Sequence, residues 1–265
     1  MAFGDMLAPR VWRYRGVEFG TDERPVNALS GWVGDWTAKT GDLRQSRGPG
    51  SYVGPHFLAA REVGMTITGR PQDVFHLERS LIIQEQTLYP LERQDLDDQG
   101  HRFVNARVVS LRRHRLRTTA IHRWDVLFLA NDPWVRSVAE SATMITPGTD
   151  STVVNAGTGL AYPKITITGP TSGTLSKVTV KNATTGRQMV LEHDVEAGET
   201  LVADVNAYVT GIGRVIDFEG ASAFGAWQRI REPLVLVSDG NVMQVTTEGS
   251  ATGATFTISW RSAWA

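Results

Sequence analysis

The stretch VEAGETLVADV, residues 195–205, gives the first indication of the fold that we expect for this chain. Its segment EAGE predicts a tight turn, because Gly198 can adopt the positive φ that such a turn demands. Beyond the turn, apolar and polar residues largely alternate, which is typical of a β-strand. We therefore expect a β-hairpin here, followed by a further strand at residues 208–213, within a β-sandwich.

Similar alternating runs recur through the second half of the chain. Turn residues separate them, as at Thr185-Gly186 and Asp239-Gly240. The expected strands cover residues 164–169, 177–182, 188–195, 200–205, 214–219, 234–239, 241–248 and 254–260. Strands of this kind, each with one polar face, predict two antiparallel sheets packed as a sandwich.

The first half of the chain combines expected strands with one helix. The run GMTITGR, residues 64–70, predicts a short strand, and residues 101–130 predict two or three more. An amphipathic helix is expected after Pro71, because apolar residues recur with helical spacing at Val74, Leu77, Leu81 and Ile82. The expected fold is mainly β, with a β-rich domain and one helix in residues 1–136 and a sandwich in residues 137–265.

The composition excludes several classes of protein. The chain has 265 residues, enough for two domains, and its net charge of -1 provides no overall attraction to nucleic acid or anionic lipid. The lack of cysteine excludes disulfides, thiolate zinc sites and a cysteine nucleophile. Residues 1–16 contain no uninterrupted apolar core of a signal peptide, and no apolar run approaches the length of a membrane span. We expect neither.

Residues 107–123 form the most basic part of the chain. Arginines occupy six positions here and no acidic residue interrupts them: Arg107, Arg112, Arg113, Arg115, Arg117 and Arg123. In a strand, Arg113, Arg115 and Arg117 would share one face. We favour ion pairs within or between subunits, because Glu92, Asp95, Asp97 and Asp98 precede this stretch. A solvated face and a contact with DNA phosphates are the alternatives.

Two of the eight tryptophans are candidates for an intersubunit contact. Trp32 and Trp36 lie in the Gly-rich stretch SGWVGDW, and tryptophan is enriched at protein interfaces. Trp124, Trp227 and Trp260 lie inside expected strands, where we expect them to pack in the core.

Motifs of catalysis are missing from the sequence. There is no HExxH, and no G-x-S-x-G, Walker A or dinucleotide motif where a strand meets a helix. Asp217 and Glu219 would share a face of a strand, as a glycosidase pair might, but an exposed polar face is the commoner reason for such spacing. We expect no enzymatic activity, no catalytic residues, no cofactor and no metal.

The chain resembles the distal tail (Dit) proteins of siphoviruses, which are also called minor tail proteins. In the second half the resemblance is carried by ITITGPTSGTLSKVTVKNATTG, VEAGETLVADV, GAWQRIREPLVLVSDGNVMQVTTEG and TFTISWRSAWA. In the first half it is carried by PGSYVGPHFLAAREVGMTITGR and FLANDPWVRS. True galectins carry His-x-Asn-x-Arg and Trp-x-x-Glu-x-Arg sugar contacts, and the nearest string here is Trp227-Gln228-Arg229.

The resemblance implies a structural role at the phage tail tip. Residues 1–136 would form the belt of a homo-hexameric ring, and residues 137–265 a galectin-like sandwich that points outward. The ring would be a baseplate hub that joins the tail tube protein to the tail-associated hub protein, with the tape measure and receptor-binding proteins as further partners. DNA would pass through the ring without specific binding, and no membrane would take part. The protein would be assembled in the host cytoplasm and reside in the virion.

A carbohydrate-binding function remains an alternative. In that case the sandwich would bind glycans of the host wall through aromatic side chains, as a lectin-like adsorption protein. Formation of a ring distinguishes the two hypotheses.

Overall fold

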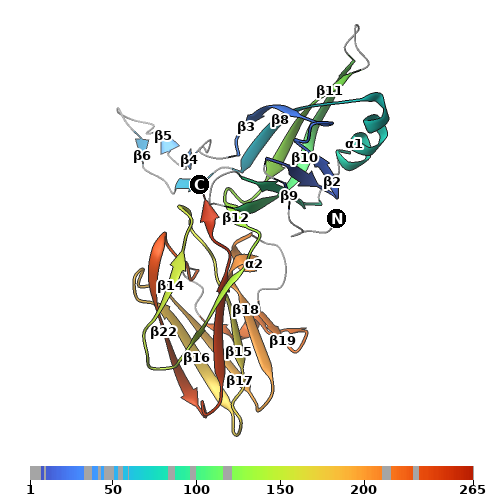
Figure 1. Cartoon of the computed structure of the whole chain (residues 1–265). Coiled ribbons are helices and arrows are strands. Elements are labelled where there is room, and N and C mark those ends of the chain that lie inside the picture. The colour runs from blue at the N-terminus through green and yellow to red at the C-terminus, as the bar shows by residue number, and fades with distance from the viewer. Residues whose placement is uncertain are drawn as a thin grey trace. The chain divides into compact units, whose positions relative to one another are not determined.

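The structure of the chain is a computed structural model. It describes residues 7–8, 10–32, 38–40, 43–44, 51–52, 56–58, 60–82, 87–95, 100–115, 121–210, 216–228 and 233–264. The chain divides into two compact units, which we call unit 1 (Met1–Val138 with Ala265) and unit 2 (Ala139–Trp264). Antiparallel sheets dominate both units, so the expected mainly β fold is confirmed (Figure 1). The division into a ring-forming domain and a galectin-like domain stays a prediction.

Unit 1 is built on one antiparallel sheet. Its strands lie side by side in the order β2 (Val17–Phe19), β1 (Trp12–Tyr14), β9 (Tyr89–Gln94), β10 (His101–Arg115), β11 (His122–Ala130), β8 (Arg61–Gly69) and β3 (Val26–Ser30). A further strand, β12 (Val135–Ser137), pairs with β10. The strands expected at residues 64–70 and within 101–130 are therefore present.

Between β3 and β8 the chain forms a separate two-stranded ribbon. Here β4 (Ala38–Thr40) pairs with β7 (His56–Leu58), and β5 (Leu43–Arg44) pairs with β6 (Ser51–Tyr52). Within the part of the chain that the structure describes, these four strands pair only with one another. In sequence these four strands lie between β3 and β8, which are themselves antiparallel neighbours.

The core of unit 1 follows from the alternation of its strands. In β8, every second residue from Arg61 to Gly69 is buried, and β11 alternates in the same way from Trp124 to Ala130. Since successive side chains of a strand point to opposite faces, Ile67 and Trp124 lie on one face of the sheet and Asp125 on the other.

The expected helix is present but short. A 3-10 turn, η1 (Pro71–Asp73), leads into α1 (Val74–Ser80), and the carboxylate of Asp73 accepts a hydrogen bond from the Arg70 amide (2.9 Å). Leu77 and Leu81 are fully buried against the sheet, whereas Ile82, which was expected on the apolar face, is 53% exposed because the helix has already ended. None of the helices in the described ranges is long and apolar enough to cross a membrane.

A β-bulge interrupts the pairing of β10 with β11. The register shifts between Val108 and Ser110, so Val109 is an extra residue on β10. Before the bulge Val108 faces the core, and after it Leu111 packs against the same core. The bulge therefore lets residues of opposite parity face one core.

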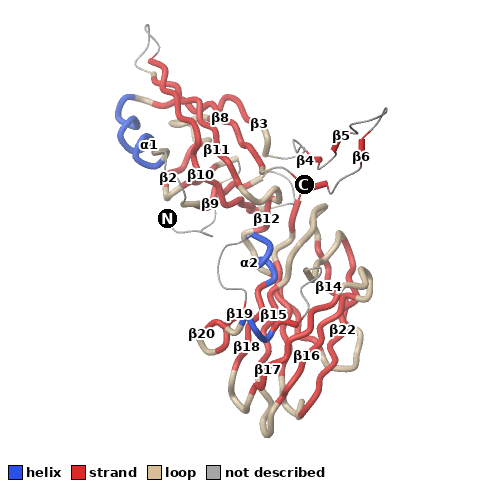
Figure 2. Tube along the Cα trace, turned by 180° about the vertical axis from the view of Figure 1, so that it is seen from behind, coloured by secondary structure: helices blue, strands red, loops and turns tan. Residues whose placement is uncertain are grey.

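Unit 2 contains two antiparallel sheets that form a sandwich (Figures 1 and 2). The first has the order β13 (Ser141–Ile145), β23 (Thr255–Trp260), β15 (Lys164–Thr168), β18 (Thr200–Asp204), β19 (Ile216–Phe218) and β20 (Ala221–Ser222). The second has the order β14 (Ser151–Asn155), β22 (Asp239–Gly249), β16 (Leu175–Asn182), β17 (Gln188–Val195) and β21 (Trp227–Gln228). Two short elements, η2 (Phe224–Ala226) and β24 (Ala263–Trp264), complete the unit.

The prediction of a hairpin at residues 195–205 is wrong. The strand before the turn, β17, belongs to one sheet, and the strand after it, β18, belongs to the other. The turn therefore crosses from one layer of the sandwich to the other. Gly169 makes this crossing possible, since its amide donates to the carbonyl of Glu199 (2.8 Å) and a Cβ at this position would lie 1.8 Å from the carbonyl oxygen of Glu196.

The prediction of a strand at residues 208–213 is wrong for residues 208–210, and its remainder lies outside the described residues. Residues Val205–Thr210 form the helix α2, and residues 211–215 lie outside the described ranges. The carboxylate of Asp204 accepts a hydrogen bond from the Ala207 amide (2.9 Å), as an N-terminal cap does. This cap favours a helix directly after β18.

The strand expected at residues 234–239 is absent as well. Leu234, Val235 and Leu236 are buried, but only Leu236 makes a β-bridge, to Ala161. Side chains take the place of a neighbouring strand. The carbonyls of Val235 and Leu236 accept hydrogen bonds from Asn182 (2.7 Å) and Asn155 (3.4 Å), and Asn241 bonds both the amide and the carbonyl of Val237.

Candidate functional site

The basic stretch of residues 107–123 surrounds the end of the hairpin formed by β10 and β11. Arg113 lies on the face that α1 covers, where its guanidinium pairs with Glu78 (2.9 Å), and both side chains remain well exposed. The acid that Arg113 meets is thus on α1 and not in the stretch at residues 92–98. Arg115 is paired with His122 along the backbone. Arg117 lies outside the described residues.

The opposite face of this hairpin holds a second charged group. Asp125 accepts hydrogen bonds from Thr66 (2.8 Å) and Arg123 (3.0 Å), and the Nε2 atom of His114 lies 3.1 Å from it. Burial raises the pKa of the Asp125 carboxyl, but these hydrogen bonds and the positive charges of Arg123 and His114 together bring that pKa below its usual value. Ion pairs within the chain therefore engage part of the basic stretch, while Arg112 is exposed.

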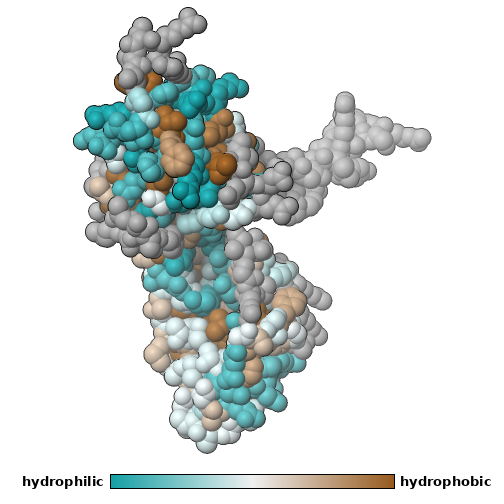
Figure 3. Space-filling model, turned by 90° about the vertical axis from the view of Figure 1, so that its right-hand side faces the viewer, coloured by the Kyte–Doolittle hydropathy of each residue, from teal (hydrophilic) through white to brown (hydrophobic). Residues whose placement is uncertain are grey.

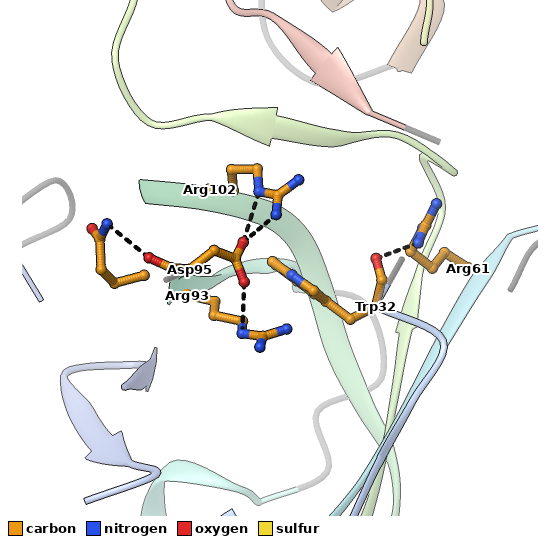
Figure 4. A network of polar contacts seen from close by, with 6 residues as sticks. Trp32, Arg61, Arg93, Asp95 and Arg102 are labelled. Carbon is orange, nitrogen blue, oxygen red and sulfur yellow. Dashed lines mark hydrogen bonds and ion pairs between the residues drawn. The ribbon is translucent and has the colours of Figure 1, made fainter. Parts of the chain in front are cut away.

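The described acids of residues 92–98 pair with other partners. Glu92 lies 3.7 Å from Nε of Arg13 and 3.1 Å from Nε2 of His101, and its side chain is almost fully buried. Asp95 pairs with Arg93 (2.9 Å) and with Nε of Arg102 (2.8 Å), as Figure 4 shows. Asp97 and Asp98 lie outside the described residues.

Trp32 is buried in unit 1, and Trp36 lies outside the described residues. The Trp32 ring packs edge-on against Trp12 with 4.6 Å between ring centroids, and 2% of Trp32 is exposed. The Arg61 guanidinium donates to the carbonyl of Gly31 (3.0 Å) and to that of Trp32, which anchors this segment (Figure 4). The intersubunit role of Trp32 and Trp36 stays a prediction.

Two surface cavities flank β3, a strand that the sequence did not single out. The larger, of about 480 Å³, is lined by Arg10, Trp12, Gly20, Thr21, Asp22, Pro25, Val26, Asn27, Ala28, Leu29 and Arg93. The smaller, of about 330 Å³, is lined by Ala28, Leu29, Ser30, Gly64, Met65, Thr66, Arg123, Asp125 and Val126. The signal that could have found them is VNALS, residues 26–30, a run without any charge.

The pair Asp217 and Glu219 does not share a strand face. Strand β19 ends at Phe218, and Glu219 has a positive φ of 47° in the turn that follows. The expectation that the two carboxylates share a face, as in a glycosidase pair, is therefore wrong. Among the described residues, no group of three or more His, Cys, Asp or Glu side chains could hold a metal ion.

Unit 2 exposes aromatic side chains near α2. Tyr208 is 38% exposed and lies 5.2 Å from the ring of Trp227, and Phe224 is 46% exposed. Trp227 itself is buried, as are Trp124 and Trp260, so the expected core positions of these three tryptophans are confirmed. Scattered hydrophobic side chains of this kind are common on protein surfaces, as on the face seen in Figure 3.

Comparison with known proteins identifies relatives by fold. No family model and no curated protein sequence matches the chain. The crystal structure of the Dit protein of phage SPP1 superposes with a TM-score of 0.67 at 15% identity, covering 96% of this chain and 99% of that one. This chain has the fold of SPP1 Dit. That protein is described as a paradigm of the hub adsorption apparatus in phages that infect Gram-positive bacteria.

Two baseplate structures of phage P2, in an activated conformation with Ca or with Sr, are also similar. Both have a TM-score of 0.48, with 8% and 9% identity, and cover 95% of this chain and 98% of theirs. The Dit-like fold expected from the sequence motifs is confirmed by the SPP1 structure at the level of the fold.

Proposed function

We propose that the chain is a structural protein of a phage tail, a distal tail hub without catalytic activity. The support is a fold shared with SPP1 Dit over nearly the whole of both chains. Unit 1 would form a hexameric ring that joins the tail tube protein to the tail-associated hub protein. Unit 2, the galectin-like sandwich of this proposal, would carry attachment to other tail proteins. DNA would pass through the ring, which would be assembled in the host cytoplasm and lie at the tail tip of a siphovirus.

The observation that carries the ring is the ribbon of β4, β5, β6 and β7. A two-stranded ribbon is at best marginally stable in water, because it lacks a third strand or a core to pack on. In the described residues, the four strands pair only with one another. A neighbouring subunit would supply the missing surface, and Trp32, Trp36, Arg113, Arg115 and Arg117 are the side chains that we propose for further contacts.

Native mass spectrometry and negative-stain electron microscopy of the purified protein test this proposal. We expect a hexamer with a central hole. A variant in which a short Asn-Gly turn replaces residues 41–55 should keep its circular dichroism spectrum and lose the hexamer. A wild-type protein that stays monomeric at high concentration, also when co-expressed with its tail proteins, would contradict the ring, whereas a hexameric shortened variant would contradict only the role of the ribbon.

Sugar binding by unit 2 is a second candidate function, favoured by the exposed rings of Tyr208 and Phe224. Aromatic faces stack on the apolar faces of sugar rings. A glycan array should then show binding by the wild type and weaker binding by the Tyr208→Ala and Phe224→Ala variants. Met144→Ala, at an exposed apolar residue of β13, is the matched control. An array without any signal would remove this candidate.

A further inference from the structure

Strand β3 is an unprotected edge of the unit 1 sheet. Within the described residues it pairs only with β8, so its other side presents unpaired backbone groups. All of its residues after Val26 are exposed, including Leu29 at 39%. Proteins usually protect such edges with charged residues or proline, and VNALS has neither; its one protective feature is a bulge at Asn27. An edge of this kind accepts strands from other chains.

The larger cavity beside this edge is lined by two cations, Arg10 and Arg93, and one acid, Asp22. Val26, Asn27, Ala28 and Leu29 form one wall, and Arg10 and Arg93 also line the cavity. The Arg93 guanidinium is held in place, since it lies 5.0 Å over the ring of Trp12 and pairs with Asp95. Arg10 is exposed. An acidic group entering the cavity would meet two guanidinium groups, which bind carboxylates strongly.

The smaller cavity lies on the other face of the same strand. It shares Ala28 and Leu29 with the larger one and includes Thr66 and Asp125, which are hydrogen-bonded on the face opposite the core. Trp12, by contrast, belongs to the core cluster. A strand added to β3 would therefore send alternate side chains into two different cavities, and this alternation is how added strands are recognised.

We propose that the free edge of β3 binds an extended strand of a partner protein, with an acidic side chain of that strand seated between Arg10 and Arg93. The next side chain of the added strand enters the smaller cavity, which offers a hydroxyl at Thr66. The unpaired backbone favours a peptide over a small anion, because a small anion would leave the edge exposed.

A display library of random short peptides, selected on the purified full-length chain, tests the proposal. Selected peptides should carry an acidic residue within a run rich in β-branched residues. A synthetic copy of the best peptide should slow hydrogen exchange at the amides of residues 26–30. Arg10→Glu should weaken this peptide about tenfold, as expected for loss of one charge-assisted hydrogen bond. Selection on Arg10→Glu should enrich a basic residue at the same position.

Arg112→Glu is the control, because it reverses the charge of an exposed arginine that lines neither cavity. Selected peptides without an acidic residue, or unchanged exchange at residues 26–30, would overturn the proposal. So would binding of inorganic phosphate in the cavity with no peptide selected, which would indicate a small-anion site. If these amides are already protected in the chain alone and lose protection on dilution, a second copy of the chain occupies the edge and the partner proposal is wrong.

Discussion

Asn182 donates its side-chain amide to Oδ1 of Asn241 at 2.9 Å, and both residues are completely buried. Together they hold the segment around Val235 and Val237, which in the described part of the chain has no neighbouring strand beyond the bridge of Leu236 to Ala161. Buried polar groups are costly unless they are hydrogen-bonded, so this pair determines whether unit 2 can bury the segment at all.

Replacing Asn241 with alanine should therefore destabilise the protein by about 3 kcal/mol, since the amide and carbonyl of Val237 lose their partners. Urea unfolding followed by circular dichroism measures this loss. Lys181→Ala, at an exposed neighbour of Asn182, should change the free energy of unfolding by less than about 0.5 kcal/mol. Equal effects of the two substitutions would show that the asparagine pair is not needed.

Gly169→Ala should disturb the crossing between the two sheets of unit 2. The new Cβ would lie 1.8 Å from the carbonyl oxygen of Glu196, so the turn has to move, at a cost of about 2 kcal/mol or more. Gly225→Ala is the matched control, because no atom lies within 4 Å of its Cβ position. Thermal unfolding of both variants measures the difference in stability. A Gly169→Ala variant as stable as the control would contradict the close approach of Gly169 to Glu196.

Trp32→Ala should lower the free energy of unfolding by about 3 kcal/mol, because Trp32 fills the core against Trp12. Phe75→Ala, at a residue that is 67% exposed, should have little effect. Denaturant unfolding of each variant must accompany any measurement of assembly, because loss of an oligomer in Trp32→Ala would otherwise be confused with loss of the fold.

Arg113 and Glu78 should be coupled only weakly. Both side chains are exposed, and ion pairs of this kind contribute about 0.5 kcal/mol. A double-mutant cycle with Arg113→Ala and Glu78→Ala, measured on the unassembled chain in low and in high salt, gives the coupling energy and its screening. A coupling above about 2 kcal/mol would contradict a solvent-exposed pair.

His101 should make stability depend on pH. Burial, and then the positive charge of Arg13, hold the pKa of His101 below its ordinary value of 6.5. The unfolded chain therefore binds this proton more readily than the folded chain, so the free energy of unfolding falls as the pH drops below about 6.5. His101→Gln should reduce this slope. Urea unfolding at several pH values compares the slopes.

Strands β8, β10 and β11 of unit 1 and strands β15 to β19, β22 and β23 of unit 2 could be predicted from the sequence because their side chains alternate in polarity, whereas the other strands of unit 1 were not singled out. Strands β13 and β14 were missed, since SATMI and STVVN are short and rich in Ser and Thr. Pairing was harder to predict than strand identity. The sequence of the turn around Gly198 is compatible with a link between neighbouring strands and with a link between the two sheets. Only its contact with the distant residue Gly169 distinguishes the two.

Side-chain hydrogen bonds explain the remaining differences. Residues 234–239 have the composition of a strand, but the side chains of the distant Asn155 and Asn182 and of the nearby Asn241 bond their backbone. For the candidate sites, the sequence identified the basic stretch but not Glu78, the acid that pairs with Arg113, because Glu78 comes close to Arg113 only through the packing of α1. The edge at β3 could not be found from the sequence, since a free edge is a property of the whole sheet.

The extra residue Val109 changes which residues of β10, the longest strand of unit 1, face the core. Upstream of it even-numbered residues such as Val108 point inward, and downstream the odd-numbered Leu111 and Arg113 do so. Losing Val109 itself would only remove the bulge, because Val108 opposite Phe128 and Ser110 opposite Leu127 would then alternate as in a regular strand and the distal half would keep its faces. A change of length that the bulge does not absorb would instead turn the distal half over, with Arg112 and His114 beneath α1 and Leu111 in water.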